Sequence, residues 1–377
     1  MKFLVITNAP TLKENDSYVA YEPYVREMNI WAKYVDAFTI LSPTSYDKAL
    51  LTSRFDVQPK VISVRSLQFN SLGAIVSSLL GMPMIVVKLF QTCKKADHIH
   101  LRCPGNMGLL GCFVQIFFPK KTKTAKYAGN WDPNAQQPLS YRLQKWILSH
   151  PFLTKNMQVL VYGDWPNQTK NIKPFFTATY KDSEIETPIK RDYSGDLKFV
   201  FVGTLVPGKR PLLALQIIEA LYKQGKNVFL EVYGEGVLKQ ELQDYIHIHG
   251  LEKIVTLHGN QSKDTIKETL KTAHFLILPS KSEGWPKAIA EGMFFGVIPM
   301  ATAVSCVPYM LDFGNRGILM EAHLNEDVNH INDALKDMEK LESMSKKASK
   351  WSQQYTLETF EKAIVKLLNY KCKFYNL

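Results

Sequence analysis

The chain has 377 residues, 46% of them hydrophobic, which is more than one hydrophobic core usually serves, so we expect two domains. Its five cysteines are widely spaced without a CxxC pair, which argues against a disulfide framework or a zinc site and favours free thiols in a reducing compartment. The net charge of +11 is uneven, because residues 1–195 hold 24 of the 46 Lys and Arg residues but only 14 of the 35 Asp and Glu residues.

The basic first half predicts an anionic partner, such as an anionic membrane surface, a phosphorylated substrate or nucleic acid. A solvated basic surface is the alternative explanation. The sequence has no nucleic-acid recognition motif, so we expect no nucleic-acid partner.

The first half alternates short apolar runs with helical periodicity, which is typical of βαβ units. The elements expected in chain order are strand Lys2–Thr7, helix Tyr21–Tyr34, strand Phe38–Leu41, an apolar helix ending near Cys93, strand His98–Arg102, helix Met107–Phe118 and strand Thr124–Ala128. Met1 leads directly into the first strand without a charged n-region, which argues against a signal peptide and favours a cytoplasmic location.

The segment Ser71–Phe90 is long and apolar enough to be considered as a membrane span. Its glycine and proline interruptions, the charge of Lys88 and its place between two strands favour a crossover helix instead. We therefore expect a helix that is buried or docked on the surface of the first domain.

Residues 176–195 are polar, charged and without period, which predicts a linker between domain 1–175 and domain 196–355. The terminal residues 356–377 predict a helix that packs back on the first domain. The elements expected in the second domain are strand Leu197–Val202, helix Pro211–Gln224, strand Val228–Tyr233, helix Val237–His249, strand Val255–Leu257, helix Lys263–Thr272, strand His274–Leu278, a helix from about Pro286 and strand Val297–Ala301. Five strands with intervening helices predict a doubly wound parallel sheet, which binds ligands beyond the carboxyl ends of its strands.

The strongest chemical signal is the segment Ser280–Glu291, SKSEGWPKAIAE. A buried strand ends here and Pro286 stands at the first helical position, so the helix presents free N–H groups that suit an anion. Glu283 and Glu291 are eight residues apart, roughly 12 Å along a helix, which is about the reach from a hexose to the ribose of a nucleotide diphosphate. Each carboxylate can accept two hydroxyl hydrogen bonds. A capping glutamate and a solvated glutamate are the alternative.

This segment resembles the Glu-x7-Glu motif of retaining glycosyltransferase family 4, whose members have the GT-B fold. The similarity extends through the second half, where four further segments resemble donor-lobe loops and strands of that family: Phe201–Lys209, Val232–Gly236, Leu257–Gly259 and Gly296–Ala301. The first half shows only the general βαβ pattern. The resemblance implies an α/β protein with two Rossmann-like doubly wound domains and an active site in the cleft between them.

The resemblance also implies roles for single residues. Glu283 would hold the transferred sugar near the reacting centre, Glu291 would bind the ribose hydroxyls, and Lys209 would stabilise the departing diphosphate. The backbone of Gly284, Trp285 and Pro286 would face the sugar and the diphosphate. The remaining predicted donor-binding residues are Gly203, Thr204, Gly234, Gly259 and Lys287.

Three departures from the family pattern are visible. Thr204 stands where the family usually has an arginine, and the loop after the first strand, NAPTLKEN, has no glycine pair. Where many members have a histidine that faces the sugar, this chain has Tyr127–Asp132, in which Asn130 and Trp131 are our acceptor-side candidates. His98 and His100 lie on an earlier strand and are interpreted as ordinary strand residues.

Two cations are candidates to replace the missing arginine. Arg210 is adjacent to Lys209, but neighbouring residues that enter a helix point about 100° apart. Lys287 lies in the first turn of the Glu283–Glu291 helix, where a lysine opposes the helix dipole and an anion would compensate it. Of the two, Lys287 is the better placed, and a lysine that simply points to solvent is the alternative.

The resemblance implies sugar transfer from a nucleotide-diphosphate donor, such as a UDP- or GDP-sugar, with retention at the anomeric carbon. The sequence has no Asp-x-Asp motif, so we expect no metal and no other cofactor. The acceptor would be a saccharide or a lipid-linked saccharide of surface polysaccharide or glycolipid synthesis. The first domain would then lie peripherally on the cytoplasmic face of a membrane, through lysines beside its apolar runs: Lys94, Lys95, Lys120, Lys121, Lys123 and Lys126.

Other functions remain open at this point. A nicotinamide oxidoreductase would need a third glycine that Gly234–Lys239 lacks. A sugar-nucleotide epimerase and the phosphorylases share the GT-B fold but resemble this donor lobe less well. A degenerate transferase, retained as a binding or scaffold partner, would explain the three departures. The sequence leaves the sugar, the nucleotide and the oligomeric state undetermined.

Overall fold

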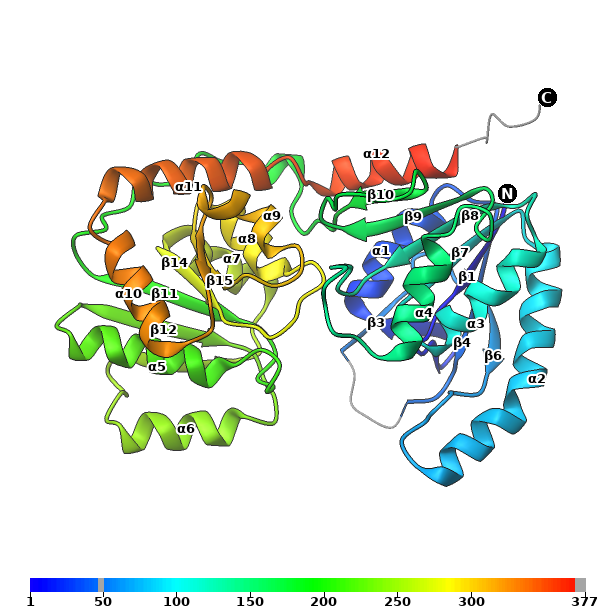
Figure 1. Ribbon diagram of the computed structural model, residues 1–377, viewed down its shortest axis with the longest axis horizontal. Helices are drawn as coiled ribbons and strands as arrows, with labels where there is room; N and C mark the ends of the chain where they lie inside the picture. The colour runs from blue at the N-terminus through cyan, green and yellow to red at the C-terminus, as the bar shows by residue number, and fades with distance from the viewer. Residues whose placement is uncertain (47–50, 370–377) are drawn as a thin grey trace. The chain divides into compact units, whose positions relative to one another are not determined.

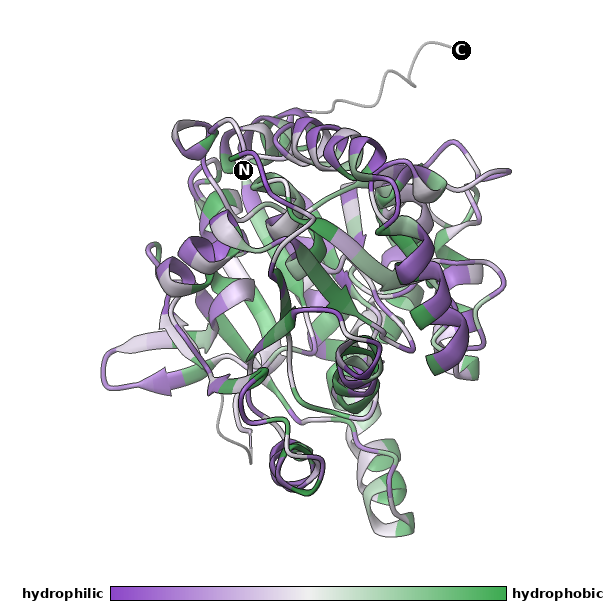
Figure 2. Ribbon diagram, turned by 90° about the vertical axis from the view of Figure 1, so that its left-hand side faces the viewer, coloured by the Kyte–Doolittle hydropathy of each residue, from purple (hydrophilic) through white to green (hydrophobic). Residues whose placement is uncertain are grey.

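The computed structural model describes residues 1–46 and 51–369, which fold into two α/β units (Figure 1). The first unit consists of Met1–Phe175 together with the C-terminal segment that begins at Glu361, and the second unit is Phe176–Phe360. In Figure 2 the strands of the two large sheets are predominantly hydrophobic, in agreement with their burial. Each unit therefore has a core of its own around a parallel sheet.

The large sheet of the first unit has seven described strands in the order β10-β9-β8-β7-β1-β4-β6, and each pairs in parallel with its neighbours. The strands are β1 (Lys2–Ile6), β4 (Ala37–Pro43), β6 (Lys60–Val64), β7 (His98–Cys103), β8 (Thr122–Tyr127), β9 (Met157–Tyr162) and β10 (Ile172–Phe175). A small antiparallel sheet joins β2 (Leu12–Glu14), β3 (Ser17–Tyr21) and β5 (Thr52–Arg54).

The helices of the first unit are α1 (Glu22–Ala32), α2 (Leu72–Lys95), α3 (Asn106–Val114) with the 3-10 turn η1 (Gln115–Phe117), and α4 (Leu139–Leu148). The long helix α2 connects β6 to β7, as expected of a crossover helix. Its N-cap is Ser71, whose hydroxyl accepts from the Ala74 N–H. Ile85 and Leu89 anchor it in the core of the unit.

The sheet of the second unit has six strands among the residues described, in the order β13-β12-β11-β14-β15-β16. They are β11 (Leu197–Val202), β12 (Val228–Tyr233), β13 (Val255–Gly259), β14 (Phe275–Leu278), β15 (Ile298–Thr302) and β16 (Ile318–Met320). The predicted number of five strands was wrong, because β16 contributes only three residues and is too short to leave a period in the sequence.

The helices of the second unit pack on both sides of this sheet, and the four that were expected, α5 to α8, begin close to the expected residues, whereas η2, α9, η3, α10 and α11 were not expected. They are η2 (Asp182–Glu184), α5 (Pro211–Lys223), α6 (Lys239–Ile248), α7 (Lys263–Thr272), α8 (Lys287–Phe294), α9 (Val307–Met310), η3 (Asp312–Gly314), α10 (Leu324–Ala334) and α11 (Met338–Ser352). The last helix, α12 (Leu357–Leu368), begins in the second unit and continues into the first.

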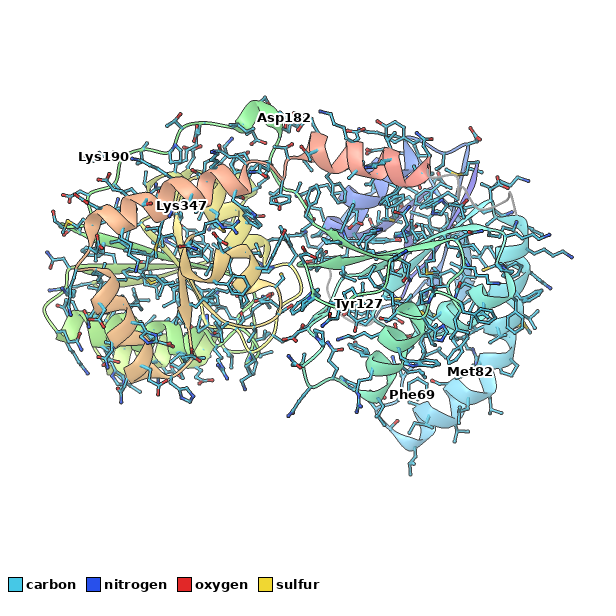
Figure 3. All side chains as sticks on the ribbon, turned by 45° about the horizontal axis from the view of Figure 1, so that its top comes forward. Phe69, Met82, Tyr127, Asp182, Lys190 and Lys347 are labelled. Atoms are coloured by element: carbon cyan, nitrogen blue, oxygen red, sulfur yellow. The ribbon has the colours of Figure 1, made fainter. Side chains whose placement is uncertain are left out.

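The segment predicted as a linker, residues 176–195, lies in the second unit, where Asp182 and Lys190 mark its course in Figure 3. It is fixed by Arg191, whose buried guanidinium donates to the carbonyls of Ala273 at 2.6 Å and Phe295 at 2.8 Å. Ala273 and Phe295 are the C-cap residues of α7 and α8, so the arginine satisfies backbone carbonyls that lack intrahelical partners. Most of the other charged residues of the segment are exposed, which accounts for its polar composition.

The predicted C-terminal helix, residues 356–377, is described as far as residue 369. In the first unit, Glu361 of α12 accepts hydrogen bonds from the Tyr34 hydroxyl at 2.7 Å and from Lys33 at 3.1 Å. These polar contacts join the C-terminal segment to the end of α1. Residues 370–377 of that prediction lie outside the described residues.

Candidate functional site

Three glycine loops meet at the carboxyl edge of the second sheet. The Gly203 N–H donates to the Tyr233 carbonyl at 2.9 Å, and the Gly234 N–H donates to the Gly259 carbonyl at 2.8 Å. Gly234 has φ of +142°, and a Cβ on it would lie 2.0 Å from the Gly203 oxygen. The loops of Gly203 and Gly234 can approach this closely only because Gly234 has no side chain. The structure thus brings together the predicted residues Gly203, Gly234 and Gly259.

The loop before α8 approaches the same edge. Strand β14 ends at Leu278, and α8 begins at Lys287 with Pro286 as its N-cap, one residue later than expected. The Lys281 N–H donates to the Gly208 carbonyl at 2.8 Å, which joins this loop to the loop after β11. Backbone hydrogen bonds therefore connect the two segments that carry the predicted catalytic residues.

Lys209 and Glu283 form an ion pair at this junction. The Lys209 Nζ lies 2.5 Å from Glu283 Oε1, and the two residues are 74 positions apart in the sequence. The Glu283 side chain is only 7% exposed, whereas that of Lys209 is 28% exposed. A half-buried ammonium beside a buried carboxylate places one cation and one pair of acceptor oxygens at the sheet edge, close to the start of α8.

The Gly284–Trp285 turn is anchored by contacts that the sequence analysis missed. The Trp285 indole stacks on Trp351 at a ring-centroid distance of 6.0 Å, and the Cys306 thiol donates to the Gly284 carbonyl at 2.9 Å. Burial raises the pKa of Cys306, and the nearby Glu283 carboxylate raises it further, so the thiol stays protonated as a donor. The Trp285 side chain is thus an anchor, and its backbone lies at the sheet edge.

Glu291 lies on the α8 helix and contacts the segment that was predicted as a linker. The Thr179 hydroxyl donates to Glu291 Oε1 at 2.7 Å, and Lys263 donates to the Thr179 carbonyl at 2.9 Å. Glu291, Lys287, Thr179 and Tyr180 line the same small crevice. Thr179 and Tyr180 were missed because their segment has no period, although its aromatic residues were a signal of burial.

Thr204, which stands in place of the family arginine, and Arg210, one candidate to replace it, both lie in the loop between β11 and α5. Thr204 is exposed in that loop. Arg210 is the N-cap of α5 and adopts a left-handed conformation with φ of +49°. Lys209, next to Arg210 in the sequence, pairs with Glu283.

The acceptor-side candidates lie in the first unit, apart from the donor loops in sequence. Trp131 is 1% exposed, and its indole N–H donates to the Gln168 side chain at 3.0 Å. Its ring packs edge-on against Tyr127, so it has no face open to a sugar, contrary to our expectation. Asn130 is half-buried, and its side-chain oxygen accepts from the Asp132 N–H at 2.8 Å, which holds the turn.

The two strand histidines are core residues, as interpreted from the sequence. Both rings bond Thr124 Oγ1, His98 at 2.9 Å and His100 at 2.8 Å. Burial lowers the pKa of His98 to about 4, so its ring is neutral near pH 7. Neither histidine is placed as a substitute for the family's sugar-facing histidine.

Two of the lysines predicted to contact a membrane are buried. The Lys123 ammonium donates to the Gln115 side chain at 2.7 Å, and Lys126 pairs with Glu27 at 2.9 Å. Both side chains belong to a sheet strand whose faces are covered, so these two predictions were wrong. Of the other predicted lysines, three are exposed, namely Lys94, Lys95 and Lys120. The fourth, Lys121, is half-buried.

The sequence analysis also missed a buried ion cluster in the first unit. Glu27 of α1 pairs with Arg102 at 2.6 Å and with Lys126 at 2.9 Å. Burial raises the pKa of the Glu27 carboxyl, but its two cationic partners outweigh burial and lower the pKa to about 2. Within residues 1–46 and 51–369, no group of three or more His, Cys, Asp or Glu side chains is placed to hold a metal ion.

Comparison with known families and proteins agrees with the donor loops. Residues 182–351 match the model of the family described as glycosyl transferases group 1. Over 166 residues the chain is 25% identical to an uncharacterised glycosyltransferase of Methanocaldococcus jannaschii, which covers 44% of this chain and 46% of that protein. Over 130 residues it is 26% identical to WcaL of Salmonella typhimurium, a glycosyltransferase named for colanic acid biosynthesis. This aligned stretch covers 33% of this chain and 32% of that protein. The chain thus matches less than half the length of these curated relatives, and the recognition is supported at the level of glycosyl transferases group 1.

Solved structures share the fold over nearly the whole length of the chain. HepE of Anabaena, in complex with UDP and glucose, has a TM-score of 0.67 at 16% identity and covers 98% of this chain and 100% of that chain. The lipopolysaccharide outer core galactosyltransferase WaaB, in its apo form, also has a TM-score of 0.67 at 16% identity, with 98% and 99% covered. The predicted GT-B fold, with two Rossmann-like domains, is confirmed.

Proposed function

We propose that the protein is a glycosyltransferase that moves a sugar from a nucleotide-diphosphate donor to an acceptor, with retention at the anomeric carbon and without a metal. The observation that carries this proposal is the Lys209–Glu283 pair at the carboxyl edge of the second sheet, beside the start of α8. The group 1 family match over residues 182–351 supports the same reaction class.

In the proposed reaction, the bond between the anomeric carbon and the diphosphate oxygen breaks while the acceptor oxygen bonds the same face of that carbon. The acceptor proton passes to the departing diphosphate. Negative charge develops on the leaving group, where the Lys209 ammonium and the N–H groups of the first turn of α8 would stabilise it. Partial burial of Lys209 strengthens this effect, because water screens the charge less.

The two glutamates would bind the two ends of the donor. Glu283 would accept hydrogen bonds from hydroxyls of the transferred sugar, since its carboxylate lies before α8. Glu291 would accept hydrogen bonds from the ribose hydroxyls. Thr179 already donates one hydroxyl hydrogen bond to Glu291, so this carboxylate suits the kind of donor that a ribose offers.

We further propose that the acceptor is a saccharide or lipid-linked saccharide of surface polysaccharide or glycolipid synthesis, used at the cytoplasmic face of a membrane. The name of WcaL and that of the galactosyltransferase WaaB point to such acceptors. The basic first half and the exposed lysines Lys94, Lys95 and Lys120 support peripheral attachment of the first unit to an anionic surface.

Thermal-shift screening against UDP-, GDP-, ADP- and CMP-sugars identifies the donor, because a bound donor raises the melting temperature by mass action. The anomeric configuration of the product, read by proton NMR in buffer with a chelator, then tests retention and metal independence together. An inverted anomer, or activity only with added divalent metal, would refute the finer proposal. Binding of a donor without turnover for any acceptor or water would favour the scaffold alternative, in which the departures at Thr204 and in the first loop mark lost catalysis.

A further inference from the structure

The outer face of α2 is unusually apolar for a crossover helix. Only 17% of its most apolar 18-residue stretch is buried, and among the described residues it is the one helix long and apolar enough to cross a bilayer. Leu72 is 84% exposed and Leu80 is 78% exposed. Spacings of three and four residues place the exposed apolar side chains along one side of the helix: Leu72, Val76, Leu79, Leu80, Met84, Val87 and Phe90. We call these residues the apolar face of α2.

The opposite side of the helix meets the sheet only along part of its length. Ile85, Leu89 and Cys93 pack in the core, all in the C-terminal half of α2. In Figure 3, Phe69 and Met82 mark the N-terminal approach and the middle of the helix. In Figure 2, α2 shows mostly hydrophobic or neutral colours. In the part of the chain that the structure describes, the N-terminal half of α2 therefore leaves Leu72, Val76 and Leu80 exposed.

Two adjoining hollows run between α2 and the sheet at its β6 edge. The first has a volume of about 460 Å³ and lies where β1, β4 and β6 begin. The second has a volume of about 540 Å³ and follows β6 toward Leu80 and Met84. Lys88 lines both hollows, and we call the two hollows together the α2–β6 groove.

The groove combines cations with an apolar floor. The first hollow is lined by Lys2, Lys60, Lys88 and Lys95, and the second by Lys88 and Arg65. Phe3, Leu4 and Ile62 supply apolar atoms between the lysines.

No acidic residue lines either hollow, and in residues 1–46 and 51–369 no ion pair joins a carboxylate to the four ammonium groups. The nearest carboxylate in the bonding pattern is that of Asp97, which accepts from the Lys2 backbone N–H at 2.7 Å. Lys88 is held in place by its hydrogen bond to the Ser63 carbonyl at 2.8 Å. Four lysines around one hollow whose lining has no acidic residue favour a multiply bonded anion.

We propose that the α2–β6 groove binds the headgroup of an anionic phospholipid, in a bilayer on which the apolar face of α2 rests. The phosphate lies among Lys2, Lys60, Lys88 and Lys95, and the acyl chains follow the second hollow toward the exposed leucines. Charge selects the anionic headgroup, and the adjoining apolar face selects a lipid over free phosphate. This inference rests on the proposed membrane attachment and names its lipid class and its site.

Vesicle co-sedimentation of the full chain tests the proposal, with phosphatidylcholine vesicles with and without phosphatidylglycerol. The groove variant is Lys60→Glu with Lys95→Glu, and the face variant is Val76→Gln with Leu80→Gln. The matched control is Lys347→Glu with Lys350→Glu, which makes the same charge change at exposed positions on α11 of the second unit (Figure 3).

We expect binding to anionic vesicles to weaken at least about tenfold in the groove variant and in the face variant, and less than about twofold in the control. Native mass spectrometry of wild-type protein should retain phosphatidylglycerol, whereas inorganic phosphate should not compete at equal concentration. The melting temperature of each variant verifies its fold, and Lys60→Gln with Lys95→Gln repeats the test if the charge reversal unfolds the protein.

Three results would overturn the proposal: equal loss in the control variant, wild-type binding by the groove variant, and a dimer that forms through the face residues without lipid. Donor hydrolysis separates this proposal from the proposed reaction. The groove variant should keep the wild-type hydrolysis rate, whereas Glu283→Gln should lose hydrolysis but keep vesicle binding. A chain that hydrolyses no donor yet binds vesicles through the groove leaves the lipid site standing and contradicts the transferase.

Discussion

The Lys209 ammonium lies 2.5 Å from the Glu283 carboxylate, so two loops that are 74 residues apart in the sequence share one charged pair at the edge of the second sheet. In the account proposed here, the donor separates these charges: the lysine turns to the diphosphate and the carboxylate to the sugar. Glu283 is buried at the sheet edge and Lys209 is half-buried, both outside the apolar core, so substitutions that keep the size of the side chain should affect catalysis more than folding.

Glu283→Gln should lower turnover by about 10³-fold, because the amide neither accepts the sugar hydroxyls as strongly nor orients Lys209. The melting temperature should stay within a few degrees of the wild type. Initial rates of nucleoside diphosphate release measure the effect. Glu268→Gln is the control, since it breaks an exposed ion pair with Lys271 in the same unit and should leave the rate unchanged. A wild-type rate for Glu283→Gln would remove the residue from the mechanism.

Glu291→Ala should weaken donor binding and change the chemical step much less. Hydrogen bonds to a charged group contribute about 1.5–3 kcal/mol, so the dissociation constant for the nucleoside diphosphate should rise by about ten- to a hundredfold. Isothermal titration calorimetry with the nucleotide measures this change. An unchanged affinity would assign Glu291 to the contact with Thr179 alone.

Lys287→Met should reduce turnover about as severely as Lys209→Met if Lys287 replaces the missing arginine. Lys287 and Glu291 line the same crevice, one helical turn apart, which places the lysine near the donor side of α8. Affinity for the nucleoside monophosphate should change little, because that ligand lacks the second phosphate. A wild-type turnover rate for Lys287→Met would leave Arg210, in the loop between β11 and α5, as the remaining candidate.

The Glu27 cluster should make the first unit sensitive to acid. Glu27 has its pKa lowered from 4.5 to about 2, so its stabilising contribution is present above about pH 4.5 and is lost as the pH falls toward 2. Glu27→Gln leaves Arg102 and Lys126 without their carboxylate and should cost about 3–5 kcal/mol at pH 7. Urea unfolding from pH 7 to pH 2.5 should show the difference from wild type shrinking as the pH falls.

The control for this experiment lies on the same helix. Glu22 pairs with Arg26 at the surface of α1, so Glu22→Gln should cost less than about 1 kcal/mol at any pH. Equal costs for the two variants would mean that the buried cluster contributes no more than a surface ion pair.

The regular part of the fold was predictable because its signals are local. Strand β14 is a run of four buried residues, and its neighbours in the second sheet have similar apolar runs. The glycines were recognisable by their spacing. The structure shows why position 234 must be glycine: the carbonyl of Gly203, 31 positions earlier in the chain, leaves no room for a side chain. Lys209 and Glu283 were predicted from their loops, and the structure adds their direct contact.

The remaining features depend on partners that are distant in the sequence. Arg191 orders the segment after the first unit through carbonyls 82 and 104 residues away, which no local pattern reveals. Trp131 stands in a turn of glycine and asparagine, so it looked exposed, but Gln168 meets its N–H 37 residues later. The strand β10 contains Pro174, and the proline is tolerated because β10 is an edge strand of its sheet.

The most direct test of the central claim is release of nucleoside diphosphate from a panel of UDP-, GDP-, ADP- and CMP-sugars by the wild-type chain, with Lys209→Met in parallel. The account predicts that at least one donor is hydrolysed slowly in the absence of acceptor, and that Lys209→Met reduces this rate by about 10²-fold or more. No release from any donor, or equal rates for the two proteins, would contradict the assignment of the Lys209–Glu283 pair to sugar transfer.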